Sequence, residues 1–106
     1  MVKDIMAEDF ESEVLGSDMP VFVDFWASWC NPCKIMAPVI DKMDEEAGNK
    51  FKFCKVNVET EREVAQFYGI MSIPTFILFK NGEEQLRLHG ARPKEEILSE
   101  IEKFAD

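Results

Sequence analysis

Two cysteines stand three positions apart in the segment WASWCNPCK, residues 26–34. Cys30 follows an apolar run, and Cys33 falls in the first turn of a predicted helix. The start of a helix offers unpaired N–H groups and a positive potential, which favour a thiolate. A disulfide that closes so small a loop restricts the unfolded chain little and adds little stability. The pair is therefore better suited to being formed and broken than to holding a fold together.

Other uses of a cysteine pair remain open at this point. Two buried structural cysteines would show the same spacing. Zinc would need four ligands, and the possible ones are Cys30, Cys33, Cys54 and His89. The last two lack the compact spacing of a zinc-ligand pair, so zinc is disfavoured. Covalent haem requires a histidine directly after the second cysteine, and Lys34 stands there instead, which excludes haem.

The elements that position the pair follow from the pattern of apolar residues. Residues 21–27, VFVDFWA, predict a strand buried on both faces, because apolar and polar residues do not alternate there. Met36, Ile40 and Met43 form one apolar stripe of a helix over residues 33–47. The other predicted elements are helices over residues 7–15 and 61–68, strands over residues 51–58, 75–79 and 83–90, and a last helix that begins at Pro93.

The order of these elements predicts an α/β fold. A strand–helix–strand unit implies parallel strands. Asn81 and Gly82 tolerate positive φ and predict a two-residue hairpin, which adds an antiparallel edge strand. The result is a mixed sheet with helices on both faces. Cys30 then falls at the carboxyl end of the first buried strand, where sites in open α/β sheets gather.

Length and composition exclude several classes of protein. The chain has 106 residues, enough for one domain with a single core. The formal net charge of −9 disfavours nucleic acid as a partner, because phosphates demand Lys and Arg. No apolar run approaches the roughly 20 residues that span a bilayer, so no membrane partner is expected. The start of the chain has no apolar signal-peptide core, which predicts a cytoplasmic protein.

One charged residue, Asp24, interrupts the first buried strand. Burying a carboxylate is costly, so we expect a raised pKa and a usable proton acceptor near neutral pH. A hydrogen-bonded structural carboxyl is the alternative. Cys54 lies in mid-strand and, by alternation, faces away from Lys55, as a small core residue would. His89 is expected to be an exposed histidine at the end of a strand.

The segment FVDFWASWCNPCKIMAP, residues 22–38, closely resembles the active-site segment of the thioredoxin family, which usually has Gly where this chain has Asn31. The similarity continues through KVNVE, YGIMSIPTFILFKNGE and HGA, and covers nearly the whole chain. It implies a single thioredoxin domain over residues 1–106, with a central mixed β-sheet flanked by helices on both faces.

The resemblance also implies roles for individual residues. Cys30 would be the exposed nucleophile that forms a mixed disulfide with a partner, and Cys33 the more buried thiol that resolves it. Asp24 would exchange a proton with Cys33. Lys55 matches a family lysine beside that carboxyl, although an exposed strand lysine is the alternative.

Binding of partners is implied for a second group of residues. Family members have a cis proline at Pro74, and the backbone of Ile73 would pair with an extended segment of the partner. Core packing is the alternative for Ile73, and Trp26 is expected in the core rather than at a contact. The full predicted binding set is Trp29, Asn31, Pro32, Met71, Ile73, Pro74, Gly90 and Ala91.

The function implied is reduction of disulfides in partner proteins by a monomeric electron carrier rather than a stand-alone enzyme. The partners would be a thioredoxin reductase, supplied by NADPH or by ferredoxin, and disulfide-containing targets. No metal and no cofactor beyond the Cys30–Cys33 disulfide are expected. Three rivals remain: an oxidant or isomerase of the same fold, which usually has His where Pro32 stands; a binding subunit without redox turnover; and a zinc module.

Overall fold

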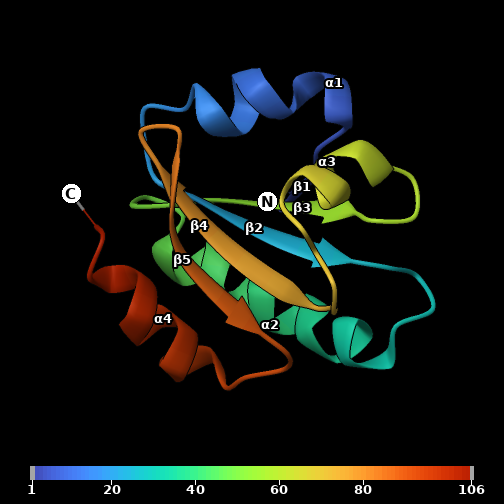
Figure 1. Cartoon of the computed structure of the whole chain (residues 1–106). Coiled ribbons are helices and arrows are strands. Elements are labelled where there is room, and N and C mark those ends of the chain that lie inside the picture. Colours follow the sequence, from blue (N-terminus) through green and yellow to red (C-terminus); the bar gives the residue numbers. More distant parts are fainter. Residues whose placement is uncertain (1, 106) are drawn as a thin grey trace.

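A computed structural model describes residues 2–105 as a five-stranded sheet with helices on both faces (Figure 1). The two terminal residues of the predicted domain, 1 and 106, lie outside this description. The elements in chain order are β1 Lys3–Asp4, α1 Ala7–Phe10, η1 Glu11–Leu15, β2 Val21–Trp26, α2 Asn31–Ala47, β3 Lys52–Asn57, α3 Arg62–Phe67, β4 Thr75–Lys80, β5 Glu83–His89 and α4 Lys94–Glu102. Within the described chain, no helix combines the length and apolarity needed to cross a bilayer.

The sheet is mixed, as predicted, with the strand order β1-β3-β2-β4-β5. Strand β3 pairs in parallel with β1 and with β2, whereas β4 runs antiparallel to β2 and β5 antiparallel to β4. The predicted hairpin joins β4 to β5, with φ of 54° at Asn81 and 79° at Gly82. Strand β1 was not predicted, because its two exposed residues carry no apolar pattern.

Two apolar layers cover the sheet, which explains why β2 reads as a continuous apolar run. Helices α2 and α4 lie on one face and α1 and α3 on the other (Figure 1). Phe22 belongs to the layer with Met36 and Ile40 of α2, whereas Val23 and Phe25 belong to the opposite layer. Side chains alternate along a strand, so Asp24 shares the α2 face with Phe22.

Three differences from the prediction have local reasons, and the other ends of the predicted elements shift by one residue at most. Helix α2 begins at Asn31, two residues early, because Cys30 acts as its N-cap and Pro32 fits the first turn. The helix over residues 7–15 becomes a π-helix in its second half, where the Gly16 N–H donates to the Glu11 carbonyl at 2.8 Å. Pro93 is the extended N-cap residue of α4 and not its first helical residue.

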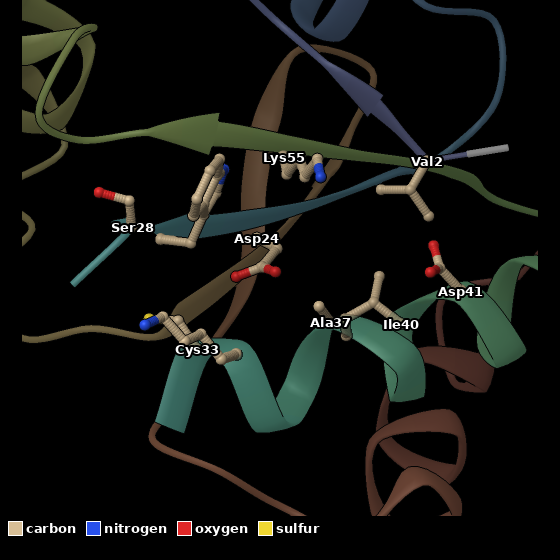
Figure 2. Close-up of a pocket in the computed structure, with 10 residues that line it drawn as sticks. Val2, Asp24, Ser28, Cys33, Ala37, Ile40, Asp41 and Lys55 are labelled. Atoms are coloured by element: carbon tan, nitrogen blue, oxygen red, sulfur yellow. The ribbon is translucent and has the colours of Figure 1, made fainter. Parts of the chain in front are cut away.

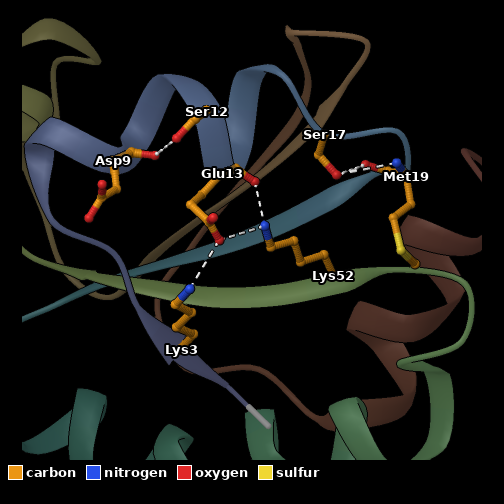
Figure 3. A network of polar contacts seen from close by, with 7 residues as sticks. All are labelled: Lys3, Asp9, Ser12, Glu13, Ser17, Met19 and Lys52. Atoms are coloured by element: carbon orange, nitrogen blue, oxygen red, sulfur yellow. Dashed lines mark hydrogen bonds and ion pairs between the residues drawn. The ribbon is translucent and has the colours of Figure 1, made fainter.

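An ionic network holds η1 against the edge of the sheet (Figure 3). The Lys52 ammonium donates to the Glu13 carbonyl oxygen at 2.7 Å and to its carboxylate at 2.9 Å. Lys3 of β1 reaches the same carboxylate at 3.3 Å. These two lysines lower the pKa of Glu13. The network thus links β1, η1 and β3.

Substitutions at two glycines test how closely η1 packs against the β4–β5 hairpin. A Cβ added at Gly82 would lie 3.2 Å from the Leu15 carbonyl oxygen, whereas a Cβ at Gly69 would meet nothing within 4 Å. Both glycines have positive φ. We expect Gly69→Ala to lower the free energy of unfolding by about 1 kcal/mol, the cost of left-handed backbone. Gly82→Ala should cost more, because η1 must also move. Urea denaturation measures both, and equal losses would contradict the close approach of η1 to the hairpin.

Candidate active site

Cys30 and Cys33 form a disulfide at the start of α2, with their Cα atoms 5.2 Å apart. The Cys33 backbone N–H points at the Cys30 sulfur, at 3.2 Å. This N–H is one of the unpaired donors of the first helical turn, and the helix dipole adds a positive potential there. When the disulfide is reduced, the same N–H is placed to stabilise a thiolate on Cys30.

The two sulfurs differ in their neighbours rather than in their exposure. Cys30 is 5% exposed and Cys33 is 3% exposed, so the expectation of an exposed Cys30 is wrong for the disulfide form. The reason is packing: both residues belong to one small apolar cluster with Ala27, against which Ile73 and Trp26 pack. The Cys30 sulfur lies 3.8 Å from the Ile73 carbonyl oxygen. Cys33 instead lines a cavity that is partly open to solvent.

Asp24 lines the same cavity as Cys33, between β2 and α2 (Figure 2). The residue is 4% exposed, and its Oδ1 atom accepts no hydrogen bond from any described residue. Burial raises the pKa of Asp24 to about 7; the charge of Lys55 opposes this rise and that of Asp4 adds to it. A carboxyl with this pKa changes protonation near neutral pH, as predicted from its place in a doubly buried strand.

Lys55 stands beside Asp24 on the neighbouring strand, where the parallel register pairs the two residues. Its ammonium lies 4.0 Å from Asp4 and 5.2 Å from the centre of the Trp26 ring. The Trp26 indole N–H donates to Asp4 at 3.3 Å. Trp26 is therefore half-buried between the cavity and Asp4, not in the core as expected. Asp4 itself was missed, because it acts through β1, a strand too short to leave a sequence signal.

The Ile73-Pro74 peptide bond is cis, the form that the resemblance implied. Pro74 is buried and Ile73 is half-buried against the disulfide cluster. The Gly90 N–H donates to the Pro74 carbonyl oxygen at 2.8 Å, which brings the end of β5 to the same place. Ile73 thus lies next to Cys30, and Gly90 lies next to Pro74.

The other members of that set are exposed beside this group. Trp29 is 65% exposed directly before Cys30, and Met71 is 95% exposed two residues before Ile73. Asn31 and Pro32 are exposed in the first turn of α2, and Ala91 is exposed after Gly90. The apolar side chains of Trp29 and Met71 are therefore exposed on the two segments that carry Cys30 and Ile73.

A hydrogen-bond chain that sequence reasoning missed fixes the loop before Pro74. The Thr75 hydroxyl donates its only proton to the Ser72 carbonyl oxygen, at 2.6 Å. It must therefore accept from His89, whose Nδ1 lies 3.1 Å away. This assigns the neutral His89 ring a proton on Nδ1. His89 is exposed at the end of β5, as predicted, but it also connects that strand to the loop at Ile73.

Cys54 lies in the opposite apolar layer, as predicted, with no exposed surface. Burial raises its pKa to about 12. Its strand pairs it with Val23, next to the pairing of Lys55 with Asp24, so the sheet separates Cys54 from the cavity. Cys54 and the Cys30–Cys33 pair therefore do not assemble into the four-ligand set considered for zinc.

Comparison with known proteins agrees with this geometry. A family model described as Thioredoxin matches residues 1–103. The chain belongs to the thioredoxin family. It is 45% identical to a Thioredoxin of Rickettsia conorii over 103 residues, which cover 97% of this chain and 98% of the relative. It is 47% identical to Thioredoxin 1 of a Nostoc species over 94 residues, 89% of this chain and 88% of the relative.

A longer relative is similar over the same region. Thioredoxin M5, chloroplastic, of Oryza sativa is 47% identical over 97 residues, which cover 92% of this chain. The match covers 56% of that protein, so the chain spans little more than half of its length. As a member of the thioredoxin family, the chain is a thiol–disulfide oxidoreductase whose redox pair is Cys30 and Cys33. Membership of this family decides against the two alternatives for the cysteine pair, namely purely structural cysteines and a zinc module.

The pKa of Asp24 makes stability depend on pH. The folded pKa of about 7 lies above the ordinary value of 3.8, so the folded state holds the proton more tightly than the unfolded state. The stabilisation from this carboxyl is complete below pH 3.8 and is lost as pH rises through about 7. We expect wild type to lose about 4 kcal/mol of unfolding free energy relative to Asp24→Asn between pH 4 and pH 8.

Urea denaturation of the oxidised proteins at a series of pH values measures this difference. Asp18→Asn, at an exposed carboxyl, is the control and should run parallel to wild type. Parallel curves for wild type and Asp24→Asn would show that Asp24 is not a desolvated acid.

Proposed function

We propose that this protein reduces disulfides in other proteins and is then reduced by a reductase. The observation that carries the proposal is the different surroundings of the two sulfurs. The Cys30 sulfur accepts from the helix start and lies beside Ile73, whereas Cys33 lines the cavity that contains Asp24. This division supports Cys30 as the nucleophile toward a partner and Cys33 as the resolving thiol.

The first step joins the protein to its target. The Cys30 thiolate attacks one sulfur of the target disulfide, that disulfide breaks, and the other target sulfur leaves as a thiolate. A mixed disulfide between Cys30 and the target results. The N–H of Cys33 and the dipole of α2 keep Cys30 ionised before the attack.

The second step releases the target. The Cys33 thiol gives its proton to the Asp24 carboxylate, and its sulfur attacks the Cys30 sulfur. The mixed disulfide breaks, the remaining target sulfur leaves as a thiolate, and the Cys30–Cys33 disulfide forms. Two electrons have passed to the target. Lys55, paired in register with Asp24, favours the ionised carboxylate that accepts the proton.

Recognition of the target would use backbone and apolar contacts. An extended segment of the partner would pair with the backbone of Ile73, beside Pro74 and Gly90. The exposed side chains of Trp29 and Met71 offer apolar contact, and Asn31, Pro32 and Ala91 complete the surface. Asn31 adds a side chain where the family usually has Gly, so a partner backbone cannot approach as closely there.

Electrons would come from a thioredoxin reductase that draws on NADPH or on ferredoxin. The protein needs no cofactor of its own in this role, because the cysteine pair carries both electrons, and it acts as a monomeric electron carrier. A reducing compartment, the cytoplasm, suits a disulfide that must be reopened in each cycle. The net charge of −9 would steer basic partner surfaces toward it.

Reduction is favoured over oxidation or isomerisation by Pro32. Oxidants and isomerases of this fold usually carry His at that position. A protonated imidazole would stabilise the thiolate and so the reduced form, which makes a stronger oxidant. Pro32 has no charge to supply this stabilisation. Redox turnover also distinguishes the proposal from a binding subunit of the same fold.

Trapping with Cys33→Ser tests the proposal. Without the resolving thiol, targets should stay bound to Cys30 as mixed disulfides that a reductant releases. Non-reducing electrophoresis followed by mass spectrometry identifies them. Cys30→Ser, tested in parallel, should trap few targets, and Cys54→Ala should behave as wild type. Equal trapping by the Cys30→Ser and Cys33→Ser variants would contradict the division of roles.

The proton acceptor has its own test. Asp24→Asn should slow insulin reduction at pH 7 by about tenfold to hundredfold, because a positioned general base is lost. The rate of alkylation of Cys30 by iodoacetamide should change little, since Asp24 shares its cavity with Cys33 and not with Cys30. A variant that reduces insulin as fast as wild type would remove Asp24 from the mechanism.

A further inference from the structure

The cavity beside Asp24 is large enough to hold a small molecule. Its volume is about 240 Å³, and it lies between α2 and strands β2 and β3 (Figure 2). A cavity of roughly 150 Å³ with apolar walls holds a benzene molecule. The apolar part of the wall here consists of Val2, Trp26, Ala37 and Ile40. A single aromatic ring with one substituent therefore fits the volume and the wall.

One polar atom within this wall lacks a partner. Asp24 is 4% exposed, and its Oδ1 accepts no hydrogen bond from the described part of the chain. A buried acceptor that is left unpaired costs free energy, and more so when it is ionised. Lys55 does not satisfy it, because its ammonium is directed toward Asp4 and the Trp26 ring. A guest that donates one hydrogen bond would remove this cost.

The charges around the cavity favour an uncharged guest. Lys34 and Lys55 line it together with Asp24 and Asp41. The two lysines balance the two carboxylates when both are ionised, so neither a cation nor an anion gains a net attraction. Hydrogen bonding and apolar contact are then the remaining sources of affinity.

We propose that this cavity is a binding site for a small uncharged molecule, an aromatic ring that carries one O–H or N–H donor, with Asp24 as its anchor. The donor hydrogen-bonds to Oδ1 of Asp24, and the ring packs between Trp26 and the Ala37–Ile40 side of α2. This site goes beyond the proposed function, because binding of the ligand involves no thiol exchange. The ligand can also bind when Cys30 and Cys33 form their disulfide.

Phenol and toluene are suitable probes, since they have nearly the same shape and differ in the donor. Heteronuclear NMR of the oxidised protein measures binding through the signals of Asp24, Ala37 and the Trp26 indole, with the Trp29 indole as an internal reference. A void without an acceptor favours toluene, because a hydroxyl costs more to bury than a methyl group. We expect the opposite order in wild type, with phenol bound about tenfold or more tightly than toluene.

Three variants locate the binding. Asp24→Leu removes the acceptor and should make toluene bind as tightly as phenol or more tightly. This variant should fold, since it replaces a buried charge by an apolar side chain. Ala37→Leu fills the cavity from the surface of α2 and should weaken both probes at least tenfold. Lys42→Leu adds a leucine to the same helix outside the cavity wall and should leave both affinities unchanged.

Two results would overturn the inference. Preference for toluene in wild type would show an apolar void in which Asp24 plays no part. Phenol binding that survives both Asp24→Leu and Ala37→Leu would place the site elsewhere. Neither result bears on the trapping of targets by Cys33→Ser, so the binding site and the proposed function can fail independently.

Discussion

Strand β2 is covered by helices on both faces, and this burial governs the behaviour of its one charged residue. Asp24 takes its pKa mainly from the loss of water, and only secondarily from the charges of Lys55 and Asp4. The same burial brings Cys33, on the facing helix, to the wall of the same cavity. A buried carboxyl destabilises the fold. The fold is therefore less stable at neutral pH, where burial opposes the ionisation of Asp24, than it would be with an uncharged side chain at this position.

The start of α2 adds a second constraint, because it gives the two cysteines different surroundings within one turn. Cys30 is the N-cap and receives the N–H of Cys33, so the sequence spacing itself supplies the donor. The loop at Ile73 then covers Cys30, and the end of β5 holds that loop through Gly90 and His89. Parts of the chain that are far apart in sequence are thus needed to make the two sulfurs unequal.

Sequence reasoning succeeded where a local pattern decides the structure. The apolar run of β2, the stripe of α2 and the turn at Asn81 and Gly82 each carry their own signal. It failed where the outcome depends on packing between distant segments. Strand β1 is too short to show alternation, and with it Asp4 was missed. The burial of Cys30 depends on Ile73, and the half-buried position of Trp26 depends on Asp4. The cavity has no sequence signal, because residues from four separate segments line it.

The placement of Cys54 has a consequence for handling and for measurement. The sheet lies between this thiol and the redox pair, so thiol exchange at Cys30 and Cys33 cannot spread to a third sulfur in the folded molecule. A thiol reagent reaches Cys54 only when the layers separate, because the side chain has no exposed surface. The rate at which Cys54 is modified therefore measures how often the core opens. In the disulfide form, Cys54 is the one free thiol of the chain. Its modification reports local opening of the core and does not alter the Cys30–Cys33 pair.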